Sequence, residues 1–249
     1  MGLLCFEEVT FYYKEGKEIL SNINLTLERG EFHCLLGRSG CGKTTLLKLA
    51  AGLLQPTSGK ILLEDERVTK PADGTAFVFQ DQTLLRWKTV LDNVLLPISL
   101  QKKVTQAAID KAYEMLRLMG IEQYANDLPR HLSGGQQARV SIARALMMNP
   151  SLLFMDEPFA ALDAITREEL QRDLLDLCTQ ENMTVLFITH DIAEAVYLSD
   201  VITVMEAGDI TASLHFPKVE LVDTAWRYSY EFVEQCRSVQ EELERKKIE

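Results

Sequence analysis

Short apolar runs, separated by turn residues, divide the first 80 positions into predicted strands and one helix. The predicted strands span 4–11, 24–27, 31–36, 60–63 and 76–80. Turns are expected at 14–16 and 29–30. A helix-forming run from about 44 to 51 follows the third strand, and Gly52 is its expected C-terminal cap. The chain therefore begins with a β-rich region that contains one early helix.

The spacing of apolar residues becomes helical between about 85 and 150. Thr105 is the expected cap of a helix that ends at Gly120. A second helix is expected to follow 133–135 and to end before 149–150. Apolar side chains share one face of each predicted helix: Ile109, Ala112, Leu116 and Met119 on the first, and Val140, Ala143 and Met147 on the second. This segment predicts a helical insertion within an α/β core.

The α/β pattern returns after position 150. A wholly apolar run over 152–155 is typical of a buried parallel strand, and further strands are expected over 184–189, also buried, and over 201–205. Thr166 and Glu169 have the spacing of a capping box for a helix that extends to about 178. Near the C-terminus, helical spacing of apolar residues predicts an amphipathic helix with a charged face, formed by Phe232, Cys236, Val239 and Leu243.

Composition narrows the class of protein. The 249 residues carry a net charge of −11, which argues against nucleic acid as a partner, because such binders usually present a basic face. No apolar run approaches the roughly 18 to 20 residues that a membrane span needs. The first residues reach Glu7 and Glu8 too soon for a signal peptide. Five scattered cysteines without metal-ligand spacing predict reduced thiols in a cytosolic protein.

A glycine-rich loop between the third strand and the first helix is the main candidate for chemistry. It reads Gly37, Arg38, Ser39, Gly40, Cys41, Gly42, Lys43, Thr44 and Thr45, the G-x-x-x-x-G-K-T spacing of a P-loop. Glycines let backbone N–H groups approach a polyphosphate, and the helix N-terminus favours the anion. Lys43 can reach the terminal phosphates, and the Thr44 hydroxyl can ligate Mg²⁺. The alternative is an ordinary glycine-rich turn with an unrelated lysine.

Two acids follow the apolar strand over 152–155. Asp156, at the carboxyl end of that strand, is suited to hold Mg²⁺ through its water shell. Glu157, one residue further, is suited to polarise a water for attack on a phosphate. Two acids at a strand end also occur in α/β proteins without any such role.

A serine followed by two glycines begins the second predicted helix of the insertion. The stretch consists of Leu132, Ser133, Gly134, Gly135 and Gln136. A capped helix start with small residues is itself ready to bind an anion. Because one P-loop already accommodates the phosphates of a nucleotide, a second anion site suggests that two chains share one nucleotide. Tyr12 and Tyr13, before the P-loop, either stack on a base or pack a sheet edge, and spacing alone favours packing.

With these motifs in this order, the chain resembles the ATP-binding cassette (ABC) ATPases over about 3–210. The resemblance implies an α/β fold: a P-loop NTPase core with a mainly parallel sheet, an N-terminal antiparallel β subdomain and an inserted helical subdomain. It divides the chain into a core (1–84 and 151–210), a helical subdomain (85–150) and a C-terminal helical tail (211–249).

The resemblance also implies site roles around ATP and Mg²⁺. Tyr13 stacks on the base, and the loop from Gly37 to Thr45 holds the phosphates. The catalytic group comprises Lys43, Gln80, Glu157 as base and His190 as sensor of the γ-phosphate. The metal group comprises Thr44, Gln80 and Asp156. In trans, the second subunit contributes Leu132, Ser133, Gly134, Gly135, Gln136 and Asp163.

The stretch 79–94 further resembles importer ATPases for nitrate, sulfonate, taurine and related solutes, although these usually carry proline where this chain has Arg86. This implies a motor subunit at the cytoplasmic face of the inner membrane. Its partners would be a transmembrane permease, a second copy of the chain and, indirectly, an extracytoplasmic solute-binding protein. The alternatives are a non-transport ABC ATPase, acting in repair, translation or cluster assembly, and a cassette that binds nucleotide without hydrolysing it.

Overall fold

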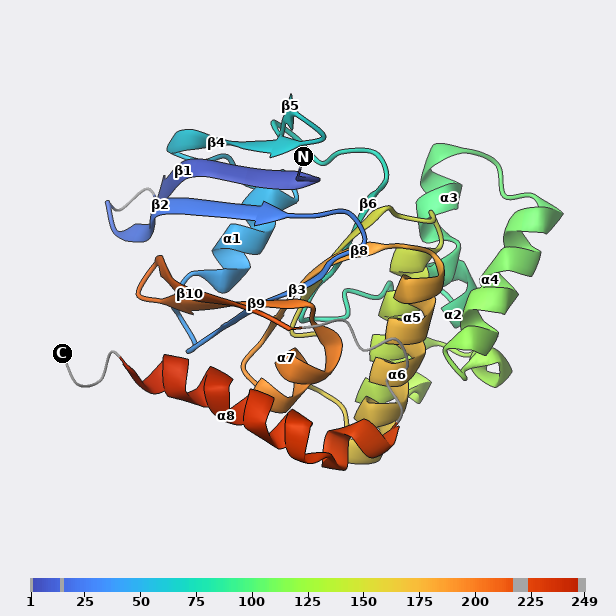
Figure 1. Cartoon of the computed structure of the whole chain (residues 1–249). Coiled ribbons are helices and arrows are strands. Elements are labelled where there is room, and N and C mark those ends of the chain that lie inside the picture. Colours follow the sequence, from blue (N-terminus) through green and yellow to red (C-terminus); the bar gives the residue numbers. More distant parts are fainter. Residues whose placement is uncertain (1, 14–15, 217–223, 246–249) are drawn as a thin grey trace. The chain divides into compact units, whose positions relative to one another are not determined.

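A computed structural model describes residues 2–13, 16–216 and 224–245, drawn in Figure 1. The chain forms two compact units. The first comprises Met1–Asp73 and Asn182–Glu249, and the second comprises Gly74–Glu181. Of the predicted turn at 14–16, only Gly16 lies within the described residues.

An antiparallel sheet forms the beginning of the first unit. Its strand order is β2 (Glu18–Leu27), β1 (Leu4–Tyr12), β4 (Ser58–Leu63) and β5 (Glu66–Arg67). In β1, Leu4 pairs with Leu27 of β2 on one side and with Leu63 of β4 on the other. Its inward side chains, Leu4, Phe6, Val9 and Phe11, are buried. The predicted N-terminal antiparallel subdomain is confirmed.

A second group of strands completes the core of the first unit. Their order is β10 (Asp209–His215), β9 (Val201–Glu206), β3 (Phe32–Gly37) and β8 (Thr184–Thr189). β3 is parallel to both of its neighbours, and β10 is antiparallel to β9. Every residue of β3 and β8 is buried, as their mainly apolar sequences predict.

The described residues of the first unit contain four helical segments. They are α1 (Lys43–Ala50), α7 (Ile192–Leu198), the 3₁₀ segment η3 (Thr224–Tyr228) and α8 (Tyr230–Arg245). α8 packs along α7, as Figure 1 shows. Phe232 and Val239 are its buried residues, which confirms the predicted amphipathic helix.

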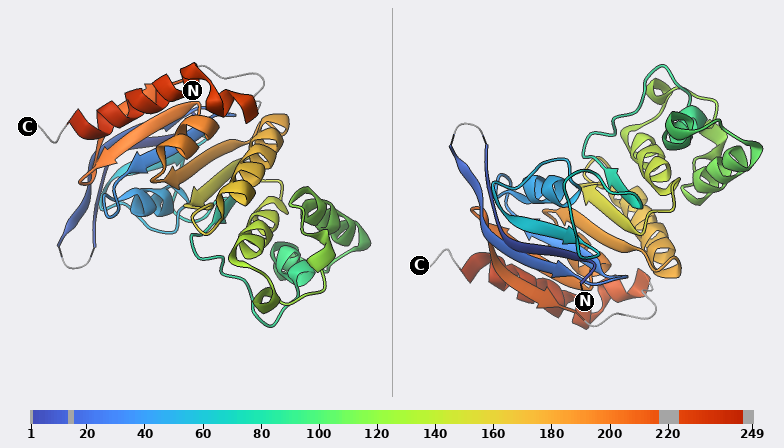
Figure 2. Two further views of the ribbon diagram at one scale, coloured as in Figure 1. Left: turned by 90° about the horizontal axis from the view of Figure 1, so that it is seen from below. Right: turned by 90° about the horizontal axis from the view of Figure 1, so that it is seen from above.

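The second unit joins a pair of parallel strands to five α-helices in its described residues. β6 (Thr75–Val78) pairs with β7 (Leu152–Asp156). The helices are α2 (Val90–Val94), α3 (Leu96–Gln101), α4 (Gln106–Leu118), α5 (Gly134–Leu146) and α6 (Ala164–Gln180), with 3₁₀ turns η1 (Glu122–Tyr124) and η2 (Pro129–His131). Two further views of these helices are given in Figure 2. The predicted helical insertion is confirmed, and Thr105 caps α4 as predicted.

The start of α6 corrects one prediction. The capping box of Thr166 and Glu169 is wrong, because the helix begins three residues earlier with Asp163 as its N-cap. A carboxylate oxygen of Asp163 accepts a hydrogen bond from the Thr166 N–H at 3.1 Å. A carboxylate is favoured at this position because its charge also complements the positive end of the helix dipole.

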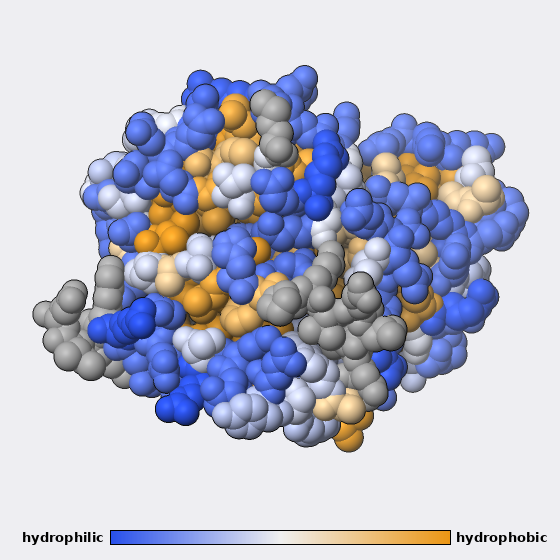
Figure 3. Space-filling model, in the orientation of Figure 1, coloured by the Kyte–Doolittle hydropathy of each residue, from blue (hydrophilic) through white to orange (hydrophobic). Residues whose placement is uncertain are grey.

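Hydrophilic residues cover most of the face shown in Figure 3, with hydrophobic residues in small groups between them. No described helix combines the length and the apolar character that a membrane span needs. All five cysteines are free thiols. Burial raises the pKa of the Cys178 thiol to about 12, so this thiol stays protonated at neutral pH.

Candidate functional site

The glycine-rich loop connects β3 to α1 in the first unit. Gly37 is the last residue of β3, and Lys43 is the first residue of α1. Gly42, the N-cap, has a φ of 107°, a conformation that side chains rarely adopt. A Cβ there would lie 2.7 Å from Leu20 Cδ2 and 3.0 Å from the Ile19 carbonyl oxygen. Close packing against β2 therefore requires glycine and fixes the path of the loop.

The ammonium group of Lys43 lies inside this loop. It donates to the carbonyl oxygens of Gly37 at 2.7 Å and Arg38 at 2.9 Å, and Cys41 Sγ lies 3.8 Å away. Lys43 is only 6% exposed, and no carboxylate of a described residue pairs with it. A buried cation that contacts only neutral groups is stabilised by an added anion. The loop thus fits the polyphosphate of ATP.

Two other predicted residues belong to the first unit with the loop. Tyr13 places its hydroxyl oxygen 3.4 Å from Thr45 Oγ1, on the first turn of α1. His190 follows β8 directly, and Thr189, the last residue of that strand, pairs with Leu36 of β3. His190 therefore lies at the same carboxyl edge of the strands as the loop. The turn after it is fixed by Asp191, whose carboxylate accepts from the N–H groups of Ala193 and Glu194.

The second unit brings Gln80 and Glu157 together. Val78 pairs with Met155 in the parallel strands, so each of these polar residues stands two positions beyond the pairing. The Gln80 side-chain nitrogen lies 3.4 Å from a carboxylate oxygen of Glu157. Glu157 has a φ of 46°, an uncommon conformation for a residue with a side chain and typical of functional sites. Asp156, just before it, is buried at the end of β7.

The start of α5 is a complete capping box. Gln136 N–H donates to Ser133 Oγ at 3.3 Å, and Ser133 N–H donates to Gln136 Oε1 at 2.9 Å. Gly134 and Gly135 form the first turn, and Leu132 is buried beneath it. A Cβ on Gly135 would lie 2.9 Å from Leu162 Cδ2, so glycine lets the turn lie against the segment that leads into α6. This packing brings the predicted Asp163 close to the predicted helix start.

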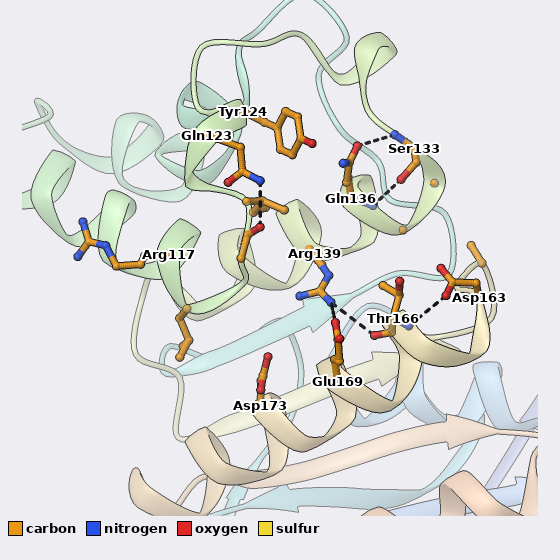
Figure 4. Close-up of a pocket in the computed structure, with 16 residues that line it drawn as sticks. Arg117, Gln123, Tyr124, Ser133, Gln136, Arg139, Asp163, Thr166, Glu169 and Asp173 are labelled. Carbon is orange, nitrogen blue, oxygen red and sulfur yellow. Dashed lines mark hydrogen bonds and ion pairs between the residues drawn. The ribbon is translucent and has the colours of Figure 1, made fainter.

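A cavity of about 710 Å³ opens between these two helix starts (Figure 4). Ser133, Gln136 and Asp163 line it, and so do residues to which the sequence analysis gave no role at a binding site, including Arg117, Gln123, Tyr124, Arg139, Glu169 and Asp173. Arg139 is three positions after Gln136, which puts both on one face of α5, and this spacing could have identified it.

Arg139 connects the walls of this cavity. Its Nη1 donates to the Met119 carbonyl oxygen at 2.8 Å. Its Nη2 lies 3.6 Å from Glu169 Oε2 and 3.5 Å from the Thr166 carbonyl oxygen. One guanidinium thereby joins the end of α4, the helix α5 and the first turns of α6. Figure 4 shows its contacts with Thr166 and Glu169.

Comparison with known proteins places these motifs in context. A family model described as ABC transporter matches residues 20–160. The aliphatic sulfonates import ATP-binding protein SsuB of Bacillus thuringiensis is 44% identical over 203 residues, covering 80% of each chain. The nitrate import ATP-binding protein NrtD of Synechococcus elongatus is 42% identical over 212 residues, covering 83% of this chain and 77% of the relative. The bicarbonate transport ATP-binding protein CmpD of Synechocystis is 42% identical over 214 residues, covering 83% and 75%.

Solved structures show the same fold. The ATP-binding cassette MJ0796, in a dimeric post-hydrolysis state bound to ADP and Pi, superposes with a TM-score of 0.79 at 32% identity. It covers 87% of this chain and 100% of that one. The structure of cbiO1 from Clostridium perfringens, part of an ABC transporter complex, gives a TM-score of 0.77 at 29% identity and covers 98% and 96%.

Proposed function

The chain belongs to the ABC transporter family of ATPases, and we propose that it is the ATP-hydrolysing motor subunit of an importer for a small solute. The observation that carries this proposal is that one chain contains both a P-loop and a second helix N-terminus suited to bind an anion, which is capped by Ser133. The relatives named above are import or transport subunits for sulfonates, nitrate and bicarbonate. These names support nitrate, a sulfonate, taurine or a related compound as the solute.

The nucleotide is held by the residues of the P-loop, with Lys43 neutralising phosphate charge and Tyr13 stacking on the base. Mg²⁺ would be held by Thr44, Gln80 and Asp156, which offer the oxygen ligands that this hard cation prefers. When bound, the metal ion would supply charge neutralisation at the phosphates.

Hydrolysis needs a polarised water near the terminal phosphate. The Glu157 carboxylate accepts a hydrogen bond from that water and takes its proton. The Gln80 amide, 3.4 Å from this carboxylate, donates to it and holds it in orientation. His190, on the rigid turn that Asp191 caps, donates to the terminal phosphate and senses its presence. Each role is assigned to the position that matches the family motif.

A second copy of the chain completes the site. Ser133, Gly134, Gly135 and Gln136, with Leu132 beneath them and Asp163 beside them, contact the nucleotide held by the partner copy. ATP then contacts two chains in the closed dimer and one chain in the open dimer. This difference in contacts shifts the population towards closure, and hydrolysis removes it.

A separate transmembrane permease converts closure into transport. We assign its contact to the segment 80–94, in which Trp87 is 76% exposed. Exposed aromatic residues are enriched in protein interfaces. The subunit then lies at the cytoplasmic face of the inner membrane, and a solute-binding protein on the far side delivers the solute. The division into core, helical subdomain and tail stated above remains part of this proposal.

The test uses a tagged Glu157→Gln chain with ATP, mixed with detergent-solubilised native membranes and analysed by mass spectrometry after affinity capture. We expect retained ATP binding, turnover reduced about 10² to 10⁴-fold, and recovery of a multi-span permease. Glu241→Gln, the same change on exposed α8, is the matched control and should keep normal turnover.

Two results would contradict the proposal at different points. Unchanged turnover of Glu157→Gln would remove Glu157 from the role of base. Recovery of ribosomal or DNA-associated proteins in place of a permease would favour the alternative, a non-transport ABC ATPase, and leave the ATPase chemistry intact.

A further inference from the structure

An arginine in the last turn of α5 holds the chain just after Gln80. Arg144 Nη2 donates to the Gln82 carbonyl oxygen at 2.9 Å and to Thr83 Oγ1 at 2.9 Å. Its Nη1 donates to the Thr83 carbonyl oxygen at 3.0 Å. Ser141, one turn earlier, adds a bond from its Oγ to the Gln82 carbonyl oxygen at 2.8 Å. The end of α5 therefore binds two consecutive peptide groups.

Arg144 is only partly buried, and its partners are unusual for a cation. Within the described part of the chain, its acceptors are uncharged oxygens of Gln82, Thr83 and Ser141. Burial lowers the pKa of Arg144, although a guanidinium still remains charged at neutral pH. Several charge-assisted hydrogen bonds from one planar guanidinium fix the geometry of the groups that accept them. The contact therefore sets the path of the backbone at Gln82 and Thr83.

The held segment is itself in a strained conformation. Thr83 has a φ of 48°, which is a clear outlier for a β-branched residue. Such strain persists where the surroundings enforce it, and it concentrates at functional sites. The other end of the segment is fixed by Asn93, which is fully buried and bonds to both the N–H and the carbonyl oxygen of Leu85.

We propose that Arg144 is a positioning residue, which fixes the segment after Gln80 to the helix that begins at Ser133, so that Gln80 stays aligned with Glu157. α5 has 13 residues and rises about 1.5 Å per residue, so Ser133 and Arg144 stand at opposite ends of one rigid element. A displacement of Gln80 is then passed to the helix start. This inference rests on the proposed role of Gln80 at the water and the metal.

The test is a double-mutant cycle on the full chain, read as kcat and KM for ATP in the presence of Mg²⁺. Arg144→Met and Gln80→Ala are made singly and together. We expect Arg144→Met to lower kcat by about 10 to 100-fold, as loss of an orienting partner typically does. KM should change little, because Lys43 and the P-loop belong to the other unit. In the double variant, kcat should equal that of Gln80→Ala alone.

Three controls accompany the cycle. Arg237→Met, on exposed α8, should leave kcat and KM unchanged. Arg144→Lys keeps the charge and loses the planar fork, and it should lose most of the same activity. Thermal unfolding of each variant reports folding. If Arg144→Met does not fold, Ser141→Ala and Thr83→Val, which each remove a single hydroxyl from the contact, enter the same cycle.

The possible failures are distinguishable. Two results would overturn the positioning role and leave the proposed role of Gln80 intact. One is a kcat of the double variant that falls by the product of the two single reductions, and the other is full activity of Arg144→Lys. Normal turnover of Gln80→Ala would contradict the role of Gln80, and the inference about Arg144 would fall with it.

Discussion

The hydroxyl oxygen of Tyr13 lies 3.4 Å from Thr45 Oγ1, so the residue after β1 is fixed beside the first turn of α1. The edge of its ring meets Phe11, with ring centroids 4.9 Å apart and an interplanar angle of 88°. Tyr13 nevertheless stays 46% exposed. A residue that served only to pack the sheet edge would bury more of its ring, and this exposure favours stacking on a base.

The first prediction concerns this ring. Tyr13→Ala should raise KM for ATP about tenfold, because stacking of a base on an aromatic side chain contributes about 1 to 3 kcal/mol. Tyr13→Phe should keep a normal KM, since the ring remains and only the contact with Thr45 is lost. Steady-state ATPase kinetics measure both. Tyr12→Ala is the control, and an equal rise in KM for that variant would show that the effect is a general loss of packing.

The sequence allowed stacking and packing for Tyr13 because linear spacing carries no information about which ring face stays open. The strands β3, β8 and β9 were predicted well, since a continuous apolar run has few alternatives to a buried strand. β10 was not predicted, because it lies at the edge of its sheet, is only partly buried and therefore has no continuous apolar run. α2 and α3 were missed because five and six residues give too short a period to detect.

The residues of the candidate site also differ in how well the sequence alone identifies them. Motif residues such as Lys43, Ser133 and Glu157 can be proposed from the sequence because their chemistry requires a fixed spacing. Arg144 was not proposed, because it acts through carbonyl oxygens of a segment distant in sequence. A backbone acceptor leaves no residue type in the sequence to pair with, so such contacts emerge only from the fold.

The second prediction concerns the N-cap of α6. The hydrogen bond from the Thr166 N–H lowers the pKa of Asp163. A carboxyl whose pKa is lower in the folded state stabilises the fold above its unfolded pKa of about 3.9, and this stabilisation is lost as pH falls through the folded value. Asp163→Asn keeps the acceptor and removes the charge.

We therefore expect Asp163→Asn to melt slightly below the unsubstituted chain at pH 7. The difference should shrink as pH falls below 4, when the native carboxyl becomes protonated. Melting temperatures across this range measure it. Asp209→Asn, which changes an exposed acid outside a helix, controls for the general effect of charge. A difference that stays constant with pH would contradict the pKa assignment.

The third prediction concerns a series of side-chain hydrogen bonds in the first unit, centred on the buried residues His33 and Thr203. His33 is 1% exposed and contacts the Glu31 carboxylate through Nδ1 and Thr203 Oγ1 through Nε2, the latter at 2.8 Å. Thr203 Oγ1 in turn lies 3.1 Å from Ser213 Oγ. These hydrogen bonds link the side chains of three neighbouring strands, β3, β9 and β10.

Thr203→Val should lower the free energy of unfolding by about 1 to 3 kcal/mol, because it removes a partner from a buried ring nitrogen. Ser213→Ala, which leaves the contact between His33 and Thr203 in place, should cost less. Urea unfolding measures both, and an unchanged m-value would show that the substitution alters stability and not the surface exposed on unfolding. Equal stability of Thr203→Val and the unsubstituted chain would show that the contact contributes nothing.

The last prediction concerns the attachment of the C-terminal helix. The Arg227 guanidinium carbon lies 3.5 Å from the centre of the Tyr197 ring, on α7, and Trp226 meets Phe232 of α8 edge to face at 4.9 Å. A cation over an aromatic ring contributes about 0.5 to 1 kcal/mol when partly exposed. In a double-mutant cycle of Arg227→Ala and Tyr197→Leu, read by urea unfolding, we expect a coupling energy in that range. Arg227→Ala should also expose α8 to faster proteolysis, while Arg237→Ala, on the outer face of α8, should cleave at the normal rate. Additive losses in the cycle would mean that the ring and the guanidinium stabilise the fold independently.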